Sequence, residues 1–107
     1  MNSKTIYSHP FFGYETLSEM PHLAFRVLCA YLFDNSDFFG LSEDDRLHLL
    51  VAPNSSSTGV RCVASILKHL ECTDITIQKH SFPERAIYSI EYFTTLRFRV
   101  SRSVIIS

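Results

Sequence analysis

The sequence predicts a small α+β domain in which three helices are followed by a β-hairpin and a C-terminal strand. Apolar residues recur at helical spacing through the first two thirds of the chain, and they alternate with polar residues in the last third. The chain has 107 residues, of which 46% are hydrophobic and 20% charged. These values are typical of one folded domain, so we expect residues 1–107 to form a single domain.

Residues 1–17 predict an irregular arm that precedes the body of the domain. His9-Pro10 and Gly13 interrupt any regular element there. We expect the aromatic side chains of the arm to pack on the body, although they could instead reach a partner; they are Tyr7, Phe11, Phe12 and Tyr14. The body would then span residues 18–100, and residues 101–107 would form a short tail.

The first predicted helix covers residues 18–33. Ser18 can cap its start, and Pro21 is tolerated in the first turn. Apolar residues follow at 3.6-residue spacing and predict a buried stripe made of Met20, Ala24, Val27, Leu28 and Tyr31. After this helix, the sequence Phe38-Phe39-Gly40-Leu41 predicts an apolar turn tucked under the core.

The second predicted helix is short and covers residues 43–51. Ser42 can cap it, and the acidic side chains of Glu43, Asp44 and Asp45 suit the positive end of a helix dipole. We expect its inward-facing residues to be Leu47, Leu50 and Val51, and we expect Ala52-Pro53-Asn54 to end the helix.

The third predicted helix, residues 57–71, has the clearest periodicity. One face carries an apolar stripe that we expect to be buried, namely Val60, Val63, Ala64, Leu67 and Leu70. The opposite face carries hydroxyl groups and basic groups, from Thr58, Arg61, Ser65, Lys68 and His69.

The last third of the chain predicts strands. Ile75 and Ile77 alternate with polar residues, as do Leu96, Phe98 and Val100. Residues 82–95 leave two alternatives open. Ser81 and Glu84 have the spacing of a capping box and could begin a fourth helix, but the β-branched and aromatic residues favour a strand. The basic alternation that ends at Arg102 is typical of an edge strand, a dimer edge or a second polyanion contact.

Residues 42–93, about half of the chain, resemble the MarR-like superfamily of winged helix-turn-helix domains. Three segments carry the resemblance: Leu47-His48-Leu49-Leu50, Ser56-Ser57-Thr58-Gly59-Val60 and Ile66-Leu67-Lys68-His69-Leu70. The resemblance implies a winged-helix-like fold with residues 57–71 as the recognition helix and a hairpin as the wing. It also implies a DNA-binding transcription regulator that acts as a homodimer, because winged helices commonly read paired half-sites.

The charge distribution favours the same half of the chain for nucleic acid. The net charge is −1, but residues 1–51 contribute 3 basic and 7 acidic side chains, whereas residues 52–107 contribute 7 basic and 4 acidic ones. We therefore expect duplex DNA to be contacted from the third helix and the wing. The expected DNA-binding residues are Ser56, Ser57, Thr58, Arg61, Ser65, Lys68, His69, Lys79, His80 and Arg85.

A protein-interaction module is the alternative function. Such an inhibitor or adaptor would keep the same fold without binding DNA, and it would use the acidic run Glu43-Asp44-Asp45 or the aromatic arm to contact a partner protein.

Enzymatic, metal-binding and membrane functions have little support in the sequence. His69 and Cys72 are the one close His–Cys pair, which is too few ligands for a metal site, so we expect no catalytic residue, no metal and no cofactor. The three cysteines, Cys29, Cys62 and Cys72, are odd in number and lie mostly in apolar settings. We expect free thiols and a cytoplasmic protein with no signal peptide and no membrane contact.

Overall fold

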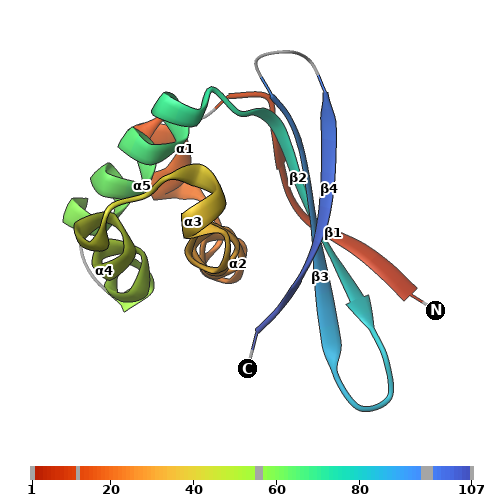
Figure 1. The fold of residues 1–107 in the computed structure, drawn as a ribbon. Coiled ribbons are helices and arrows are strands. Elements are labelled where there is room, and N and C mark those ends of the chain that lie inside the picture. The colour runs from red at the N-terminus through yellow and green to blue at the C-terminus, as the bar shows by residue number, and fades with distance from the viewer. Residues whose placement is uncertain (1, 12, 55–56, 95–97, 107) are drawn as a thin grey trace.

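The computed structural model describes residues 2–11, 13–54, 57–94 and 98–106. The chain forms two layers, a four-stranded antiparallel sheet and a group of helices that covers one face of it (Figure 1). In chain order the elements are β1 (Asn2–His9), α1 (Tyr14–Glu19), α2 (His22–Asp34), α3 (Ser36–Phe39), α4 (Glu43–Val51), the 3₁₀ turn η1 (Ala52–Asn54), α5 (Ser57–Leu70), β2 (Thr73–Ser81), β3 (Ala86–Phe93) and β4 (Arg99–Ile105).

The strands lie in the order β1-β2-β3-β4, and each pair of neighbours is antiparallel. All the helices fall between β1 and β2, which lie side by side in the sheet. The strand β1 is therefore an edge strand placed by a long connection, whereas β2, β3 and β4 follow one another directly. As predicted for the basic C-terminal segment, β4 lies at the other edge of the sheet.

The predicted fold class, three helices followed by a hairpin and a strand, is wrong. A strand comes first, and the described residues contain five α-helices before β2. The arm predicted for residues 1–17 is instead β1 and most of α1. Its strand was hidden because a bulge between Thr5 and Tyr7 shifts the pairing register with β2. As a result, the neighbours Ile6 and Tyr7 both pack against the core, which destroys the period-two alternation of a strand.

The single helix predicted over residues 18–33 is two helices. Met20 and Pro21 have extended ψ values of 137° and 141° between α1 and α2. Proline disfavours helical geometry in the residue before it, so the chain breaks at Met20. Ser18 lies within α1, where its hydroxyl donates to the carbonyl of Glu15 instead of capping a helix.

The segment after α2 folds as the short helix α3, which ends at Gly40 with a left-handed φ of 67°. Phe39 contacts Tyr31 edge to face, with ring centroids 5.8 Å apart. Phe38 is 83% exposed, so of the two phenylalanines in the predicted apolar turn only Phe39 packs against the core.

The helix α4 has the bounds that the sequence predicts, and its capping box is formed. The Ser42 hydroxyl accepts from the Asp45 amide at 3.1 Å, and the Asp45 carboxylate accepts from the Ser42 amide at 3.3 Å. The predicted inward face is wrong, because Leu49 is the buried leucine of α4 while Leu47, Leu50 and Val51 are exposed.

The helix α5 ends one residue before its predicted limit, at Leu70. Glu71 and Asp74 have left-handed φ values of 53° and 55°, and they turn the chain from α5 into β2. Val63 and Leu67 are buried as predicted, whereas Val60, Ala64 and Leu70 pack against the edge of the core.

Of the two alternatives for residues 82–95, the strand is confirmed as β3. The Phe82 amide donates to the Arg85 carbonyl at 2.8 Å and closes a hairpin turn. Ser81 therefore ends β2, Glu84 lies in the turn, and neither residue begins a helix. The sequence predicts a strand around residues 96–100 and a tail over residues 101–107. The structure has one strand there, β4, which runs from Arg99 to Ile105. Residues 95–97 lie outside the described part of the chain.

The core lies between the sheet and α2, the central helix. The helix α2 packs against β3 and β4 of the sheet and against α4. The buried side chains of α2 belong to one hydrophobic cluster with Ile77, Ile90 and Val104 from the sheet. At one end of this core the hydroxyls of Tyr31 and Tyr92 are 2.5 Å apart and form a buried hydrogen bond.

Candidate nucleic-acid interface

The exposed face of α5 brings together the described residues that the sequence predicts there. All six are exposed: Ser57, Thr58, Arg61, Ser65, Lys68 and His69. At 100° per residue they occupy about a third of the helix circumference, opposite the buried Gly59, Val63, Ile66 and Leu67. We call these six residues the α5 face. Ser56, the remaining predicted residue, lies outside the described residues.

The α5 face carries positive charge. Arg61 and Lys68 lie seven residues apart, which is about 10 Å along a helix, with Ser65 between them. The helix contains no acidic residue. Two cations and several hydroxyls therefore line a surface about two turns long.

Arg61 is held in place by an aromatic ring. Its guanidinium carbon lies 5.2 Å from the centroid of the Tyr14 ring, a cation–π contact between α5 and α1. The contact limits the rotamers of Arg61 but leaves the residue exposed. Tyr14, which the sequence assigned to the aromatic arm, is thus a support for the predicted interface.

The three residues predicted in the wing do not join the α5 face. Arg85 lies in the loop between β2 and β3, at the end of the sheet opposite to the end that connects to α5 (Figure 1). Lys79 pairs in register with Lys4 and Tyr88. These residues lie far from α5 because β2, which is nine residues long, carries the chain away from the helices before the loop that contains Arg85.

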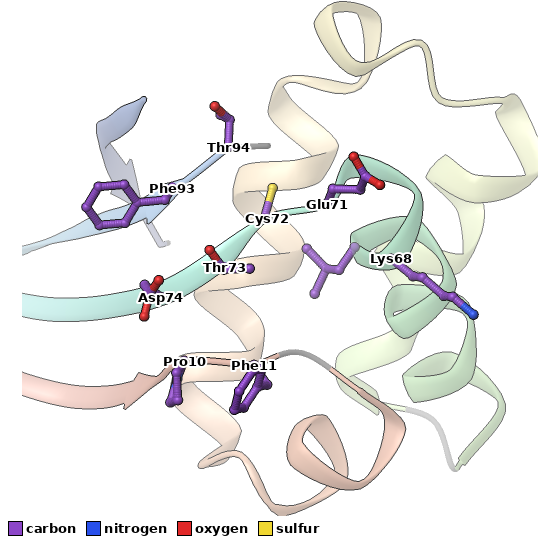
Figure 2. Close-up of a pocket in the computed structure, with 10 residues that line it drawn as sticks. Pro10, Phe11, Lys68, Glu71, Cys72, Thr73, Asp74, Phe93 and Thr94 are labelled. Atoms are coloured by element: carbon purple, nitrogen blue, oxygen red, sulfur yellow. The ribbon is translucent and has the colours of Figure 1, made fainter. Parts of the chain in front are cut away.

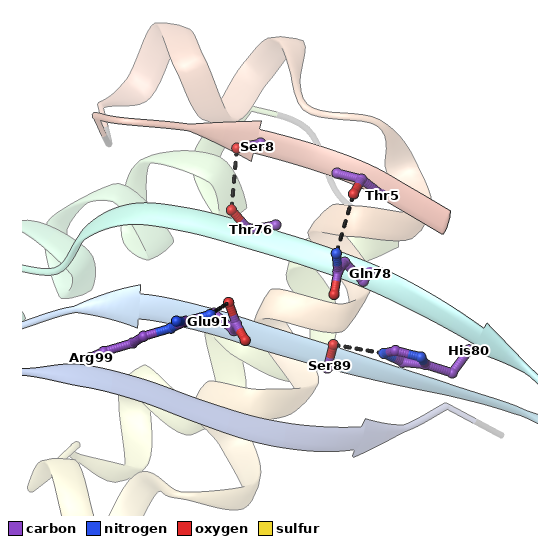
Figure 3. Close-up of polar contacts among 8 residues, drawn as sticks. All are labelled: Thr5, Ser8, Thr76, Gln78, His80, Ser89, Glu91 and Arg99. Atoms are coloured by element: carbon purple, nitrogen blue, oxygen red, sulfur yellow. Dashed lines mark hydrogen bonds and ion pairs between the residues drawn. The ribbon is translucent and has the colours of Figure 1, made fainter. Parts of the chain in front are cut away.

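His80 belongs to another surface, the uncovered face of the sheet. Its Nε2 atom lies 3.0 Å from the Ser89 hydroxyl, and Arg99 pairs with Glu91 at 2.6 Å on the same face (Figure 3). Across β1 and β2, the hydroxyls of Ser8 and Thr76 are 3.2 Å apart. On this face Arg99 is neutralised by Glu91, and the other side chains shown are joined in pairs by hydrogen bonds between strands.

A pocket of about 700 Å³ opens beside the C-terminal end of α5. Phe11, from the connection between β1 and α1, and Phe93, from β3, line it, and Asp74 lies between them (Figure 2). Lys68 also lines it, but its amino group points away from Asp74 (Figure 2). Lys68 is therefore directed toward the solvent beside α5 and not into the pocket.

The thiol in this pocket is poorly suited to nucleophilic chemistry. Burial raises the pKa of Cys72 to about 11, so the thiol is protonated near neutral pH. Its sulfur contacts the Leu70 carbonyl at 3.9 Å, while His69 lies on the exposed face of α5. All three cysteines are free thiols, as predicted.

All three acidic residues lie in the first turn of α4, where the helix dipole favours them, but only one of the three carboxylates makes a hydrogen bond there. The Asp45 carboxylate completes the capping box, whereas Glu43 and Asp44 are exposed and make no ion pair within the described residues.

The aromatic residues predicted to form an N-terminal arm include Phe11, which follows β1. Phe11 is 69% exposed, and its amide donates to His9 Nδ1 at 3.1 Å. Phe12 lies outside the described residues.

An exposed aliphatic face on α4 is a functional surface that the sequence analysis missed. Leu47, Leu50 and Val51 are 60%, 55% and 52% exposed, and their i, i+3, i+4 spacing puts them on one side of the helix. The same spacing usually marks a buried stripe, which explains the wrong prediction. The only signal in the sequence was that Leu49, between them, offered a competing inward position.

Among the described residues, no three or more His, Cys, Asp or Glu side chains gather where they could hold a metal ion. No helix in the described ranges combines the length and the apolar character needed to cross a bilayer. The chain matches no family model, no curated protein and no solved structure with which it was compared. Its function must therefore be argued from its own residues.

Proposed function

We propose that this protein binds duplex DNA through the α5 face. The observation that carries the proposal is the α5 face itself, where Arg61 and Lys68 are exposed on a helix without acidic residues. An α-helix fits the major groove of DNA, which is about 12 Å wide. With 14 residues, α5 is about 21 Å long and can present both cations to the groove and its flanking phosphates.

The neighbouring elements support this use of α5. The helix α4 and the turn η1 both pack directly against α5, so neighbouring elements hold α5 in place. Tyr14 holds Arg61 at the exposed surface, which reduces the entropy lost when the guanidinium contacts a phosphate. The hydroxyls of Thr58 and Ser65 add hydrogen-bonding groups to the same face.

The modest charge sets the expected strength of binding. The net charge is −1, so long-range attraction to a polyanion is weak and the contacts must come from the α5 face locally. Each phosphate contact by Lys or Arg contributes about −0.9 to the slope of log affinity against log salt. We therefore expect weak, salt-sensitive binding by a single copy.

The test is a titration of fluorescently labelled random-sequence duplex DNA, followed by anisotropy at about 50 mM and about 200 mM salt. The double variant Arg61→Glu with Lys68→Glu removes both cations of the α5 face. We expect at least roughly a tenfold loss of affinity, because two favourable phosphate contacts become repulsive. Circular dichroism should show an intact fold, since neither side chain is buried.

The matched control is Lys4→Glu with Arg85→Glu. Both residues are exposed, and the double variant changes the net charge by the same amount as the α5 variant. The loop between β2 and β3, which contains Arg85, lies at the end of the sheet away from the connection to α5 (Figure 1), so the control should retain most of the affinity. An equal loss in both variants would attribute binding to overall charge and overturn the assignment to α5. A folded wild-type protein that shows no binding at tens of micromolar in about 50 mM salt would overturn DNA binding altogether.

A further inference from the structure

The exposed aliphatic face of α4 continues into a groove. Leu50 belongs to both, and the groove, about 430 Å³ in volume, lies between α2, the end of α4 and the end of β4. Ala30, Phe33 and Ile106 contribute further apolar surface to its lining. The groove itself is mixed, because polar and charged side chains, among them Arg26 and Asn54, line it beside these apolar ones. The apolar contact surface is therefore the exposed face of α4 together with the adjoining apolar part of the groove, and exposed apolar patches of this kind mark interaction sites.

The charges around this surface have opposite signs at its two ends. At the N-terminal end of α4, Glu43 and Asp44 are exposed and make no ion pair within the described residues. At the other end, the groove lining includes His22 and Arg26 beside Asn54, and the one acid there is Asp34. Arg46, which lies over the Phe33 ring at 5.0 Å, is on α4 itself between the two ends and does not belong to the basic end.

This polarity makes the surface complementary to itself when two copies meet with their α4 helices antiparallel. If the helices cross midway between residues 48 and 49, Leu47 of one copy faces Leu50 of the other. The same geometry sets Glu43 against Asn54 of the second copy, where Arg26 and His22 line the groove. A parallel arrangement would instead bring acids against acids, which is repulsive.

We propose that α4 is the contact surface of a two-fold symmetric homodimer, in which Leu47, Leu50 and Val51 of both copies pack together. A two-fold axis repeats each contact, so the pairing of Glu43 with Arg26 occurs twice. The apolar centre is small compared with the roughly 800 Å² per partner of a stable interface, so the dimer is weak and forms at high micromolar concentration. The inference is independent of DNA binding, because no residue of the α5 face takes part.

The first experiment measures the oligomeric state of the full chain by sedimentation velocity, from micromolar to near-millimolar concentration. Wild-type protein should shift from monomer to dimer. The variant Leu47→Ser with Leu50→Ser should weaken dimerisation by roughly tenfold or more, since it removes apolar surface from both copies. The control Phe82→Ser also removes an exposed apolar side chain, but it lies in the β2–β3 loop and should dimerise like wild type.

A charge swap tests whether the second copy is the occupant and whether the helices are antiparallel. Glu43→Arg alone and Arg26→Glu alone should each weaken the dimer, and the two together should restore it because the pair is re-formed with exchanged signs. Thermal melts of each variant establish that the fold is intact.

Three results would overturn the proposal. A wild-type chain that stays monomeric at every concentration would show that a second copy does not bind the α4 face. A dimer that is insensitive to Leu47→Ser with Leu50→Ser would place the interface elsewhere. A double charge swap that does not recover dimerisation would contradict the antiparallel pairing.

Discussion

The hydroxyls of Tyr31 and Tyr92 are the clearest polar contact inside the core. They are 2.5 Å apart, and the two rings meet edge to face with centroids 5.8 Å apart. The bond joins α2 to β3 across 61 residues of sequence. Burial is the main cause that raises the pKa of both tyrosines, so both hydroxyls stay protonated and the bond persists well above neutral pH.

We expect Tyr92→Phe to lower the free energy of unfolding by about 1–3 kcal/mol, because it leaves the buried Tyr31 hydroxyl without its partner. The double variant Tyr31→Phe with Tyr92→Phe should cost less than the sum of the two single changes. Urea denaturation of the four proteins measures this coupling, and strict additivity would show that the hydroxyls do not interact.

Leu67 tests whether α5 is part of the core. Leu67→Ala should cost about 2–5 kcal/mol, since the side chain is 2% exposed and packs at the centre of the core. Leu47→Ala makes the same chemical change at an exposed position and should cost less than about 0.5 kcal/mol in a monomeric sample. Denaturant melts compare the two. A cost below half a kcal/mol for Leu67→Ala would mean that α5 does not pack as described.

At the scale of elements, two similar sequence patterns have different outcomes. Ser42 and Asp45 form a capping box at the start of α4, whereas Ser81 and Glu84, which have the same spacing, lie at a hairpin turn. The difference arises because β3 pairs on both sides, with β2 and with β4. Those ladders outweigh the local preference of a few residues for a helix.

Ser42→Ala should therefore destabilise the protein by about 0.5–2 kcal/mol, because the Asp45 amide loses its acceptor. Ser81→Ala should change stability by less than about 0.5 kcal/mol, since Ser81 is exposed and caps no helix. Thermal unfolding monitored by circular dichroism distinguishes the two. Equal effects of both substitutions would contradict the assigned roles.

For the whole molecule, the buried thiols and phenols predict instability at alkaline pH. Burial raises the pKa of Cys29 to about 12 and that of Cys72 to about 11. In the unfolded chain a thiol ionises near pH 8.5. The native state therefore keeps protons that the unfolded state releases. The contribution of these two thiols to stability is fully present below about pH 8.5 and is lost as the pH rises toward 11–12.

A series of melts from about pH 7 to about pH 11 should show this fall, and Cys29→Ala should make it less steep because one ionising group is removed. The comparison uses the slope with pH rather than the absolute stability, which the substitution itself lowers. Stability that stays level across this range in the wild type would contradict the burial of these groups.

The sequence by itself determined the elements whose signals are local. The bounds of α4, its cap at Ser42 and the opposite faces of α5 follow from side-chain spacing and capping chemistry, and they need no distant contacts. The six described residues of the predicted recognition face lie together because one helix carries them all. Neighbours on a single helix are fixed by its geometry, so this part of the candidate site could be predicted.

Only the tertiary structure decided the features that depend on long-range pairing. The strand β1 exists because β2 offers it an edge, and its bulge removes the alternation that would have revealed it. The direction of β2 separates Arg85 from Arg61 and Lys68, although all three belong to the basic half of the chain. On α4, Leu49 turns inward because α2 and α5 pack on that side, which leaves Leu47, Leu50 and Val51 in solvent. An apolar stripe indicates a surface that avoids water, but only the packing of the neighbouring elements determines whether the chain itself covers it.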